Sequence, residues 1–373
     1  MTILRTFERS QDPKTSQANF KSGVIGLGFI GEVHLRAIRA AGGVVHSIAA
    51  ATLEESERAA QRLGIENYST ADAMFADPKI DVVHICTPNI YHAELAEKAI
   101  RAGKSVICEK PLAIDVASAE KLVQLAAENG VVATVPFIYR YHPSVIESKA
   151  RISNLDENLN LLHGYYLQDW LSREKTMNWR VDPQFGGPSR AFGDIGIHWC
   201  DLMEFVTGHR IVSLNAQLLK VFGTRAGVEK INTEDGATII FKTDQGAMGS
   251  LVISQTSAGY KNKLWFSFES ASHSFSFNQE SPETLWVGGL ESNQIVMRGN
   301  SEESAAAKAY SFLPAGHPQG YQDCFNAFIA DTYKAIAGKT TDVLPTFRDG
   351  LRSAKLTQAV LESSHTGLWV DLK

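Results

Sequence analysis

The sequence predicts a two-domain protein: an N-terminal Rossmann domain with a doubly wound parallel sheet (α/β), and a C-terminal α+β domain built on a large open antiparallel sheet. Three observations predict it. The 373 residues exceed what one hydrophobic core usually serves. Short β-rich runs alternate with helical stretches over 22–142, whereas from about residue 160 strand-like runs follow one another directly. We therefore divide the chain into a polar N-terminal tail (1–21), a Rossmann domain (22–142) and a second domain (143–373).

The first domain is expected to alternate strand and helix throughout. Expected strands cover 22–28, 44–52, 81–89, 105–111 and 131–137. Expected helices cover 31–43, 53–64, 92–103 and 115–130. Val33, Ala37, Ile38 and Ala41 recur at helical spacing, so the first helix has one apolar face. Strands separated by helices pair in parallel through right-handed crossovers, which gives a doubly wound sheet.

The second domain is expected to be a meander of strands with three later helices. The turn at Asp244–Gly246 marks a hairpin between two apolar runs. The helices are expected at about 194–207, 319–337 and 346–364. An open sheet with apolar strands leaves a face that favours a partner, so we expect a homodimer or homotetramer through this sheet.

Composition excludes several classes of protein. The formal net charge is −5, and 44% of the residues are hydrophobic and 21% charged. Neither a nucleic-acid partner nor a membrane partner is expected from this balance. The four cysteines form no CxxC pair, which favours reduced thiols and a cytoplasmic location. Residues 1–21 have no uninterrupted apolar core, so we do not interpret them as a signal peptide.

A glycine-rich turn, GLGFIG, joins the first expected strand to the first expected helix. In this context Gly26 permits a tight turn, Gly28 lets the backbone approach a pyrophosphate, and Gly31 lets the helix pack closely on the strand. The helix N-terminus adds free N–H groups and a positive dipole end. The turn therefore predicts a dinucleotide site, which also includes Phe29 and Ile30. The alternative is a glycine-rich turn without a ligand.

The end of the second expected strand leaves the choice of dinucleotide open. A ribose-binding acid usually lies about 20 residues after the turn, but Ala50, Ala51 and Thr52 occupy this place. Thr52 can hydrogen-bond either ribose form, and no arginine lies beside the strand to attract a 2′-phosphate. NAD and NADP both stay possible, and the missing cation favours NAD.

Four motifs follow one another along the chain: GLGFIG (26–31), ICTPNIYH (85–92), CEKPL (108–112) and GDIGIH (193–198). This order resembles the glucose–fructose oxidoreductase / inositol dehydrogenase / rhizopine-catabolism (Gfo/Idh/MocA) family, from about residue 22 to the C-terminus. The resemblance implies a substrate-binding second domain. It also implies NAD(P)-dependent hydride transfer to or from a secondary alcohol of a sugar, anhydrosugar or polyol.

The resemblance carries over to individual positions. Lys110 takes the place of the active-site lysine, with a cis peptide often preceding Pro111, and Asp194 and His198 take the places of the second-domain acid and histidine. Around the cofactor it implies Thr87, Pro88, Asn89, His92, Glu109, Lys110, Trp179 and Arg180. Two departures stand out: the ribose acid is absent, and Tyr139-Arg140-Tyr141 replaces the usual Asn-Arg-Arg. The stretches QDW (168–170), WRVDPQFGG (179–187) and GHPQGY (316–321) are also similar to the levoglucosan (anhydrosugar) dehydrogenase subgroup.

Oxidising an alcohol needs a hydride acceptor and a base for the hydroxyl proton. Our hypothesis makes His198 the general base, Lys110 the donor that stabilises developing charge, and Asp194 the residue that orients the imidazole from four positions away on a helix. Lysine and histidine could exchange these duties. Asp194 after Gly193 is also a good helix N-cap, and a histidine beside an apolar stripe is often structural.

Sugar recognition needs hydrogen-bonding side chains and apolar ring faces. Candidate substrate-binding residues are Tyr139, Gln168, Asp169, Asp182 and His317. No metal site is expected. Two other functions share this scaffold: a non-catalytic dinucleotide-binding regulator, and a redox-assisted glycosidase that oxidises, eliminates and re-reduces on one bound cofactor.

Overall fold

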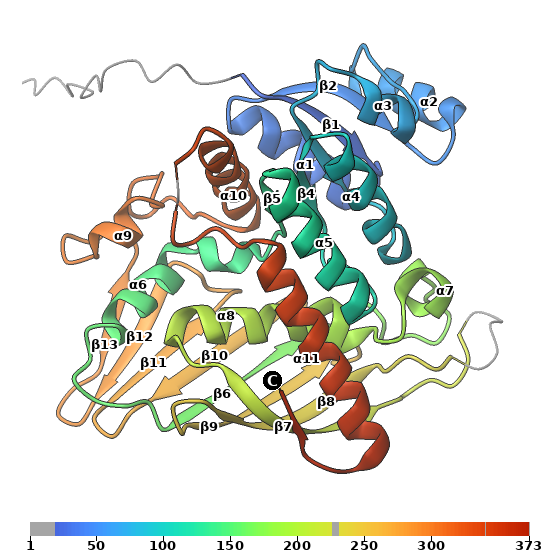
Figure 1. Cartoon of the computed structure of the whole chain (residues 1–373). Helices are drawn as coiled ribbons and strands as arrows, with labels where there is room; N and C mark the ends of the chain where they lie inside the picture. The colour runs from blue at the N-terminus through green and yellow to red at the C-terminus, as the bar shows by residue number, and fades with distance from the viewer. Residues whose placement is uncertain (1–18, 226–230, 340, 373) are drawn as a thin grey trace, which may run out of the picture.

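A computed structural model describes residues 19–225, 231–339 and 341–372, and it holds two sheets (Figure 1). The first is a parallel sheet in the order β2-β1-β3-β4-β5. Its strands are β1 (Lys21–Ile25), β2 (Val44–Ala49), β3 (Val82–Ile85), β4 (Ser105–Cys108) and β5 (Ala133–Thr134). The helices that follow these strands are α1 (Phe29–Ala40), α2 (Leu53–Leu63), α3 (Ala71–Ala76), α4 (His92–Arg101) and α5 (Val116–Asn129). This is the predicted Rossmann arrangement.

The second sheet has nine strands in the order β13-β12-β11-β10-β6-β9-β8-β7-β14. The strands are β6 (Leu161–Leu167), β7 (Ile211–Leu219), β8 (Gly236–Thr243), β9 (Met248–Ser254), β10 (Lys263–Glu269), β11 (His273–Asn278), β12 (Thr284–Gly289), β13 (Gln294–Met297) and β14 (Val370–Asp371). The remaining helices are α6 (Pro143–Ile152), α7 (Pro183–Gly186), α8 (Ile197–Thr207), α9 (Ala305–Lys308), α10 (Tyr321–Ile336) and α11 (Phe347–Thr366). The predicted hairpin is β8–β9, with Gly246 at a φ of +86° in its turn.

The sheet departs from the antiparallel prediction at its centre, because β6 and β9 pair in parallel from Leu161↔Met248 to Leu167↔Ser254. Other differences are at element ends and in short helices. The strand β5 has only two residues, and the helices α3, α6, α7 and α9 were not predicted. The helix expected at 194–207 begins earlier, with a π-helical turn at Phe192–Gly196 before α8.

Helices from the C-terminal part of the chain pack on the Rossmann domain. The Tyr333 hydroxyl of α10 lies 2.8 Å from the Ser22 hydroxyl of β1, and the Phe325 ring meets His34 of α1 at 5.2 Å between centroids. A bridge joins Thr134 of β5 to Thr346 at the start of α11. These contacts fix the two sheets relative to each other.

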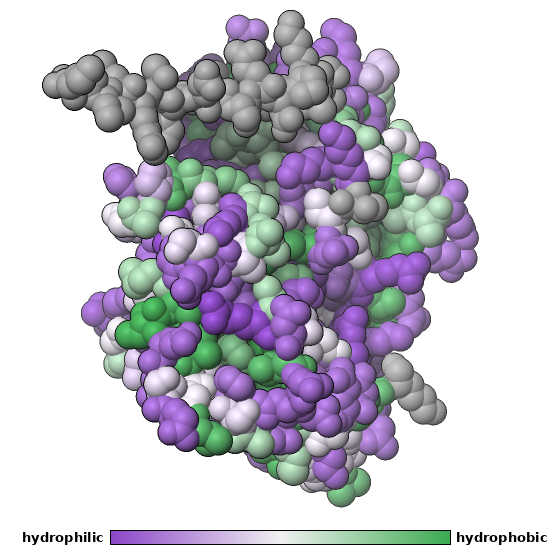
Figure 2. Space-filling view, turned by 90° about the vertical axis from the view of Figure 1, so that its left-hand side faces the viewer, coloured by the Kyte–Doolittle hydropathy of each residue, from purple (hydrophilic) through white to green (hydrophobic). Residues whose placement is uncertain are grey.

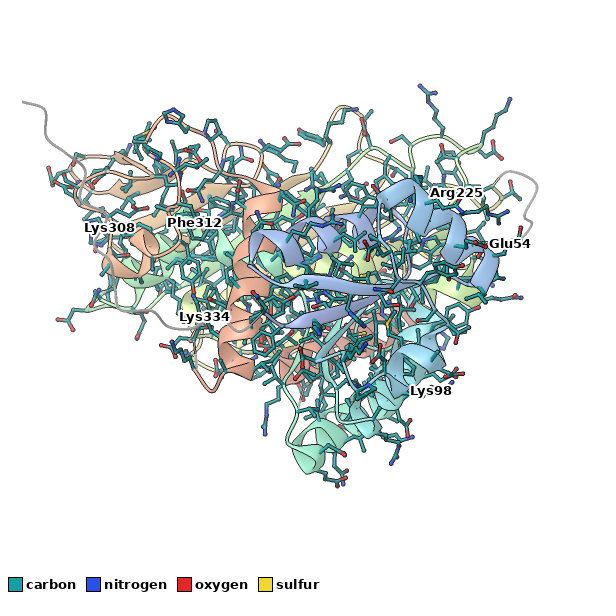
Figure 3. The ribbon with its side chains drawn as sticks, turned by 90° about the horizontal axis from the view of Figure 1, so that it is seen from above. Glu54, Lys98, Arg225, Lys308, Phe312 and Lys334 are labelled. Carbon is teal, nitrogen blue, oxygen red and sulfur yellow. The ribbon has the colours of Figure 1, made fainter. Side chains whose placement is uncertain are left out.

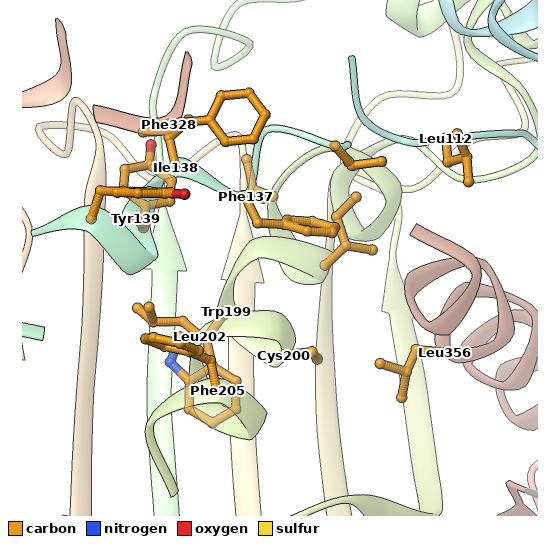
Figure 4. Packing of buried hydrophobic residues seen from close by; sticks show 14 of the residues in the cluster. Leu112, Phe137, Ile138, Tyr139, Trp199, Cys200, Leu202, Phe205, Phe328 and Leu356 are labelled. Atoms are coloured by element: carbon orange, nitrogen blue, oxygen red, sulfur yellow. The ribbon is translucent and has the colours of Figure 1, made fainter. Parts of the chain in front are cut away.

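The second sheet and the helix α8 share a core in which Trp199 and Leu202 pack below Phe137 and Tyr139 (Figure 4). The Trp199 ring N–H donates to the Trp265 carbonyl of β10 at 2.9 Å. Because α8 begins at Ile197, within GDIGIH, this packing fixes the motif against the sheet.

The described surface carries charged side chains on the Rossmann domain and exposed apolar side chains on the nine-stranded sheet. Charged side chains such as Glu54 of α2 and Lys98 of α4 lie at the outside of the Rossmann domain (Figure 3). Figure 2 shows apolar side chains gathered low on the side where β11 to β13 lie. Exposed apolar residues on the sheet include Ile240, Met248, Val252, Trp286, Ile295 and Met297. Within residues 19–225, 231–339 and 341–372, no helix has the length and apolarity to cross a membrane. All four cysteines are buried and free of disulfides.

Candidate active site

The glycine turn between β1 and α1 forms a cradle with one open side. A Cβ on Gly26, which has a φ of +91°, would lie 2.5 Å from the Cys86 carbonyl oxygen. A Cβ on Gly31 would lie 2.1 Å from the Gly26 carbonyl oxygen, whereas Gly28 faces open space. No side chain caps the N-terminus of α1, so its first N–H groups face the cavity. The Thr87 hydroxyl is buried nearby and has no hydrogen-bond partner among the residues that the structure describes. These features fit a dinucleotide pyrophosphate and ribose.

The glycine cradle opens into a cavity of about 870 Å³. Of the predicted cofactor-binding residues, it is lined by Gly26, Gly28, Phe29, Ile30, Thr87, Pro88, Asn89, His92, Glu109, Lys110, Trp179 and Arg180. Gly31 lies beneath the turn, and Thr52 is absent from the lining.

Two of these residues brace the loops instead of offering free polar atoms. The His92 ring nitrogens lie 2.7 Å from the Pro111 carbonyl oxygen and 2.9 Å from that of Thr87. The Asn89 amide donates to the Gly186 carbonyl at 2.9 Å, which ties the Rossmann loop to α7. Arg180 stacks over Trp179 at 4.3 Å.

We expect Gly31→Ala to weaken NADH binding by about tenfold or more, equivalent to about 1.4 kcal/mol, because the added methyl group displaces the backbone at Gly26. Titration of intrinsic and NADH fluorescence measures this. Gly223→Ala is the matched control, since no atom of the residues that the structure describes lies within 4 Å of its Cβ position. Equal affinities in both variants would contradict this assignment of the cradle.

The adenosine end of the cavity has a different charge pattern from the one the sequence suggests. Thr52 caps α2: its hydroxyl accepts from the Glu55 N–H, and the Glu55 carboxylate accepts from the Thr52 N–H, both at 3.2 Å. Glu55 and Arg62 line the cavity. Arg62 is paired with Glu32 at 2.7 Å. A carboxylate is therefore present after all, on α2 instead of at the strand end, and the arginine in the lining is paired with Glu32.

Lys110 and Asp194 meet across the boundary between the two sheets. The Lys110 ammonium donates to the Asp194 carboxylate at 2.6 Å and to the Asp194 carbonyl at 3.1 Å. The other carboxylate oxygen accepts from the Gln255 amide at 2.8 Å. The Arg180 guanidinium lies 3.4 Å from the oxygen that Lys110 bonds. The expected cis peptide precedes Pro111.

The surroundings keep Asp194 ionised. Burial raises the pKa of Asp194, but the charges of Lys110 and Arg180, with the hydrogen bond from Lys110, lower it well below its usual range overall. Asp194 is therefore no proton acceptor at neutral pH, and it holds the lysine ammonium.

Asp194 does not have the position expected for an N-cap or for a partner of the imidazole. Its N–H donates to the Arg190 carbonyl at 2.8 Å, so it lies inside the π-helical turn. Its carboxylate is bonded to Lys110 and Gln255, and no hydrogen bond joins it to His198 among the residues the structure describes. The π turn changes the angular relation between positions 194 and 198 from that of an α-helix, which accounts for the absence of the expected i, i+4 hydrogen bond among the described residues.

His198 lines a second cavity, of about 330 Å³, that shares Phe29, Ile30, Glu109, Lys110 and Arg180 with the first. The edges of Phe137 and Tyr139 hold its ring, at centroid distances of 5.6 and 5.1 Å. Its Nδ1 is buried without a partner. Burial lowers the pKa of His198 well below its ordinary value, and the charge of Lys110 lowers it further. His198 is therefore neutral near pH 7.

A network of neutral polar groups forms the wall opposite Lys110. The Tyr139 and Tyr166 hydroxyls lie 2.7 Å apart, and Tyr166 donates to the Asn262 side chain at 2.6 Å. The Asn262 amide donates to Tyr139 at 3.0 Å, and the Gln168 amide donates to Asn262 at 2.8 Å. Burial raises the pKa of Tyr139 to about 12, so its phenol stays neutral. Amides and phenols of this kind are suited to sugar hydroxyls.

Three predicted substrate-binding residues lie outside this second cavity. Asp169 is paired with Lys261 at 2.6 Å, and Asp182 caps α7 by accepting from the Gln184 N–H at 2.9 Å. His317 is exposed, and its carbonyl accepts from Arg298 at 2.6 Å. Sequence reasoning missed seven of the lining residues and also Gln255 behind Asp194. The seven are Pro136, Ile138, Tyr166, Ile195, Asn262, Tyr321 and Phe325. The alternation in LLHGYYLQ, which places Tyr166 on the inner face, was the one available signal.

Comparison with known proteins agrees with this geometry. A family model described as an oxidoreductase family with an NAD-binding Rossmann fold matches residues 20–137, and a GFO/IDH/MocA C-terminal domain model matches residues 158–273. Levoglucosan dehydrogenase from Pseudarthrobacter phenanthrenivorans is 32% identical over 95% of this chain and 98% of its own length. Inositol 2-dehydrogenase from Rhizobium meliloti is 24% identical over 91% of this chain and 96% of its own.

Solved structures are also similar. One is a levoglucosan dehydrogenase in complex with NADH and L-sorbose, with a TM-score of 0.88, 30% identity, and coverage of 95% of this chain and 99% of that one. With a relative above 30% identity along nearly its whole length, and with both of its domains matched in order, this chain belongs to the Gfo/Idh/MocA family of oxidoreductases.

Proposed function

We propose that this protein is an NAD-dependent dehydrogenase that oxidises a secondary alcohol of a small neutral sugar, anhydrosugar or polyol. The convergence of Lys110, Asp194 and His198 on a cavity that adjoins the dinucleotide cavity carries this proposal. The similarity to levoglucosan dehydrogenase along nearly the full chain supports the anhydrosugar class. A regulator that only binds a dinucleotide would not need these three groups beside it.

Each of the three residues has a task that its surroundings permit. The Lys110 ammonium uses two of its three hydrogens on Asp194 and keeps one for the substrate oxygen. This positive charge stabilises the developing alkoxide. His198 lines the cavity and is neutral, so a ring nitrogen takes the hydroxyl proton. Asp194 holds the ammonium in place. When bound, the nicotinamide supplies the hydride acceptor.

The wall of the substrate cavity supplies recognition. Tyr139, Tyr166, Gln168 and Asn262 would bond the remaining hydroxyls, and Ile138 and Phe325 would cover apolar faces of the ring. Lys110 and Arg180 are the two cations in the lining, and both face Asp194. A sugar phosphate would therefore find no uncommitted cation among the lining residues that the structure describes.

The test is a panel of neutral sugars, anhydrosugars and inositols with NAD⁺ and NADP⁺, followed through the absorbance of the reduced nicotinamide. We expect turnover with at least one neutral compound and none with its phosphate ester. Tight dinucleotide binding without turnover would favour the regulator instead. Glycoside cleavage without net reduction of the cofactor would favour the redox-assisted glycosidase.

We expect NAD⁺ to be preferred over NADP⁺, because a 2′-phosphate at the end of β2 would face Glu55, and Arg62 is already paired with Glu32. Glu55→Gln should narrow that preference by about fivefold, the factor that corresponds to about 1 kcal/mol of repulsion between charges 4 Å apart in water. The ratio of kcat/KM for the two cofactors measures it. Glu54→Gln is the control, since Glu54 is exposed and paired with Arg58; the same shift in this variant would contradict the assignment.

We also propose that the protein works in the cytoplasm as a homodimer or homotetramer, joined through the outer face of the nine-stranded sheet. The exposed side chains of Ile240, Met248 and Val252 on neighbouring strands support this. Light scattering of the purified protein measures the subunit number, and a monodisperse monomer would contradict the proposal.

A further inference from the structure

Three buried polar side chains meet between the glycine turn and Lys110. His34 belongs to α1, His84 to β3, and Glu109 follows β4. Their exposed fractions are 0%, 0% and 5%. His34 Nδ1 lies 3.0 Å from His84 Nδ1, and His34 Nε2 lies 3.1 Å from Glu109 Oε1. The second Glu109 oxygen accepts from the backbone N–H of Lys110 at 3.1 Å. We call His34, His84 and Glu109 the buried triad.

The hydrogen-bond directions in the buried triad follow from proton counting. An ionised carboxylate only accepts, so His34 donates from Nε2 to Glu109. In a neutral His34 the other nitrogen, Nδ1, then accepts from the Nδ1–H of His84. His84 is left with an unprotonated Nε2, which is buried without a partner. Both ring nitrogens of His34 are thus used, and its ring has one orientation.

Glu109 stays ionised in this place. Burial raises the pKa of Glu109, but the hydrogen bond from His34 and the charge of Lys110 lower it overall. The titratable groups that face it are His34, His84 through His34, His92, Lys110, Cys86, Cys108 and Tyr321. His34 is the one that donates a side-chain hydrogen bond to it.

The buried triad links two parts of the active site. At one end is α1, whose N-terminal turn is the glycine cradle, and at the other is the backbone of Lys110, whose ammonium reaches Asp194. We propose that His34 is a positioning residue for Lys110: it fixes Glu109, Glu109 fixes the Lys110 backbone, and His84 fixes the tautomer of His34. The inference rests on the proposed function, because its effect is measured on turnover.

Packing alone does not account for the buried triad. The edge of the His34 ring meets Phe325, a contact that an apolar side chain could also make. Burying imidazoles and a carboxylate costs free energy unless they are hydrogen-bonded. Here the chain of hydrogen bonds ends at the backbone N–H of Lys110. Holding the Lys110 backbone in place is a role that explains why these polar groups are buried here.

The experiment compares His34→Leu, which fills the space without polar atoms, with His34→Gln, whose amide can still donate to Glu109. We expect His34→Leu to lower kcat by roughly tenfold to a hundredfold, the range that a small misplacement of a catalytic group produces. KM for NAD⁺ should change little, and His34→Gln should recover most of the loss. The control is His46→Leu, which removes a histidine bonded to Asp77 at the same 3.1 Å distance but outside both cavities.

A double-mutant cycle separates positioning from packing. In a Glu109→Gln background, His34→Leu should add little to the loss of kcat, because the bond it removes no longer acts on a carboxylate. Additive losses, or equal effects of His34→Leu and His46→Leu, would overturn the proposal.

A second measurement does not depend on turnover. NMR of isotope-labelled histidine should show His34 as a neutral ring protonated at Nε2, and Glu109→Gln should shift that signal. A signal that Glu109→Gln leaves unchanged would overturn the inference. If no sugar is turned over by the unmodified protein, the proposed function fails, while this spectrum still reports on the buried triad.

Discussion

Lys110→Met is expected to lower kcat for sugar oxidation by roughly a hundredfold to ten-thousandfold, the usual size of acid–base and charge-stabilising effects. The substitution keeps an unbranched side chain of similar length and removes the ammonium that bonds Asp194 at 2.6 Å. The substrate oxygen then loses its cationic donor, and the Asp194 carboxylate stays in the cavity facing Arg180 and Gln255 alone. Steady-state kinetics with NAD⁺ measure the loss.

NADH affinity should change far less than kcat, because the glycine cradle and the Thr87 hydroxyl are untouched. Lys121→Met is the matched control: its ammonium also lies 2.6 Å from a carboxylate, that of Glu97, but on the exposed surface of α5. Turnover of Lys110→Met within a few fold of this control would show that the lysine has no part in the chemistry.

Much of the fold could be predicted because its signals are local. A glycine turn between an apolar strand and an amphipathic helix specifies the first crossover of a Rossmann sheet, and GLGFIG lies in such a place. The parallel pairing of β6 with β9 could not be predicted, since these strands are far apart in sequence and no local pattern encodes the direction of their pairing.

Candidate site residues could be predicted where they lie in a recognisable motif. Residues that reach the site only through tertiary packing could not. Lys110 and His198, which the motifs mark as candidates, both line the proposed substrate cavity. Asn262 lies directly before β10, and Gln255, which bonds Asp194, lies directly after β9. Neither residue is part of a recognisable motif. Asp182 shows the opposite error: a polar residue beside a conspicuous motif serves as a helix cap.

His198→Gln is expected to lower kcat by about a hundredfold or more, because it removes the group that takes the hydroxyl proton and keeps a polar side chain of similar size. NADH binding should be unaffected. The wild-type pH profile gives a sharper result. Burial and the Lys110 charge lower the pKa of His198 well below 6.5, which favours the neutral form. The fall in kcat/KM on the acid side should therefore lie below pH 6.5, and it should be absent in His198→Gln.

The same profile decides between histidine and lysine as the proton acceptor. The Lys110 charge is one cause of the lowered pKa of His198, so removing it should raise that pKa. In Lys110→Met, the acid limb of the residual activity should therefore lie at a higher pH than in the wild type. Such a shift is expected only if His198 titrates beside the lysine. If the limb instead persists in His198→Gln and disappears in Lys110→Met, the lysine takes the proton, and the imidazole serves to bind the substrate hydroxyl.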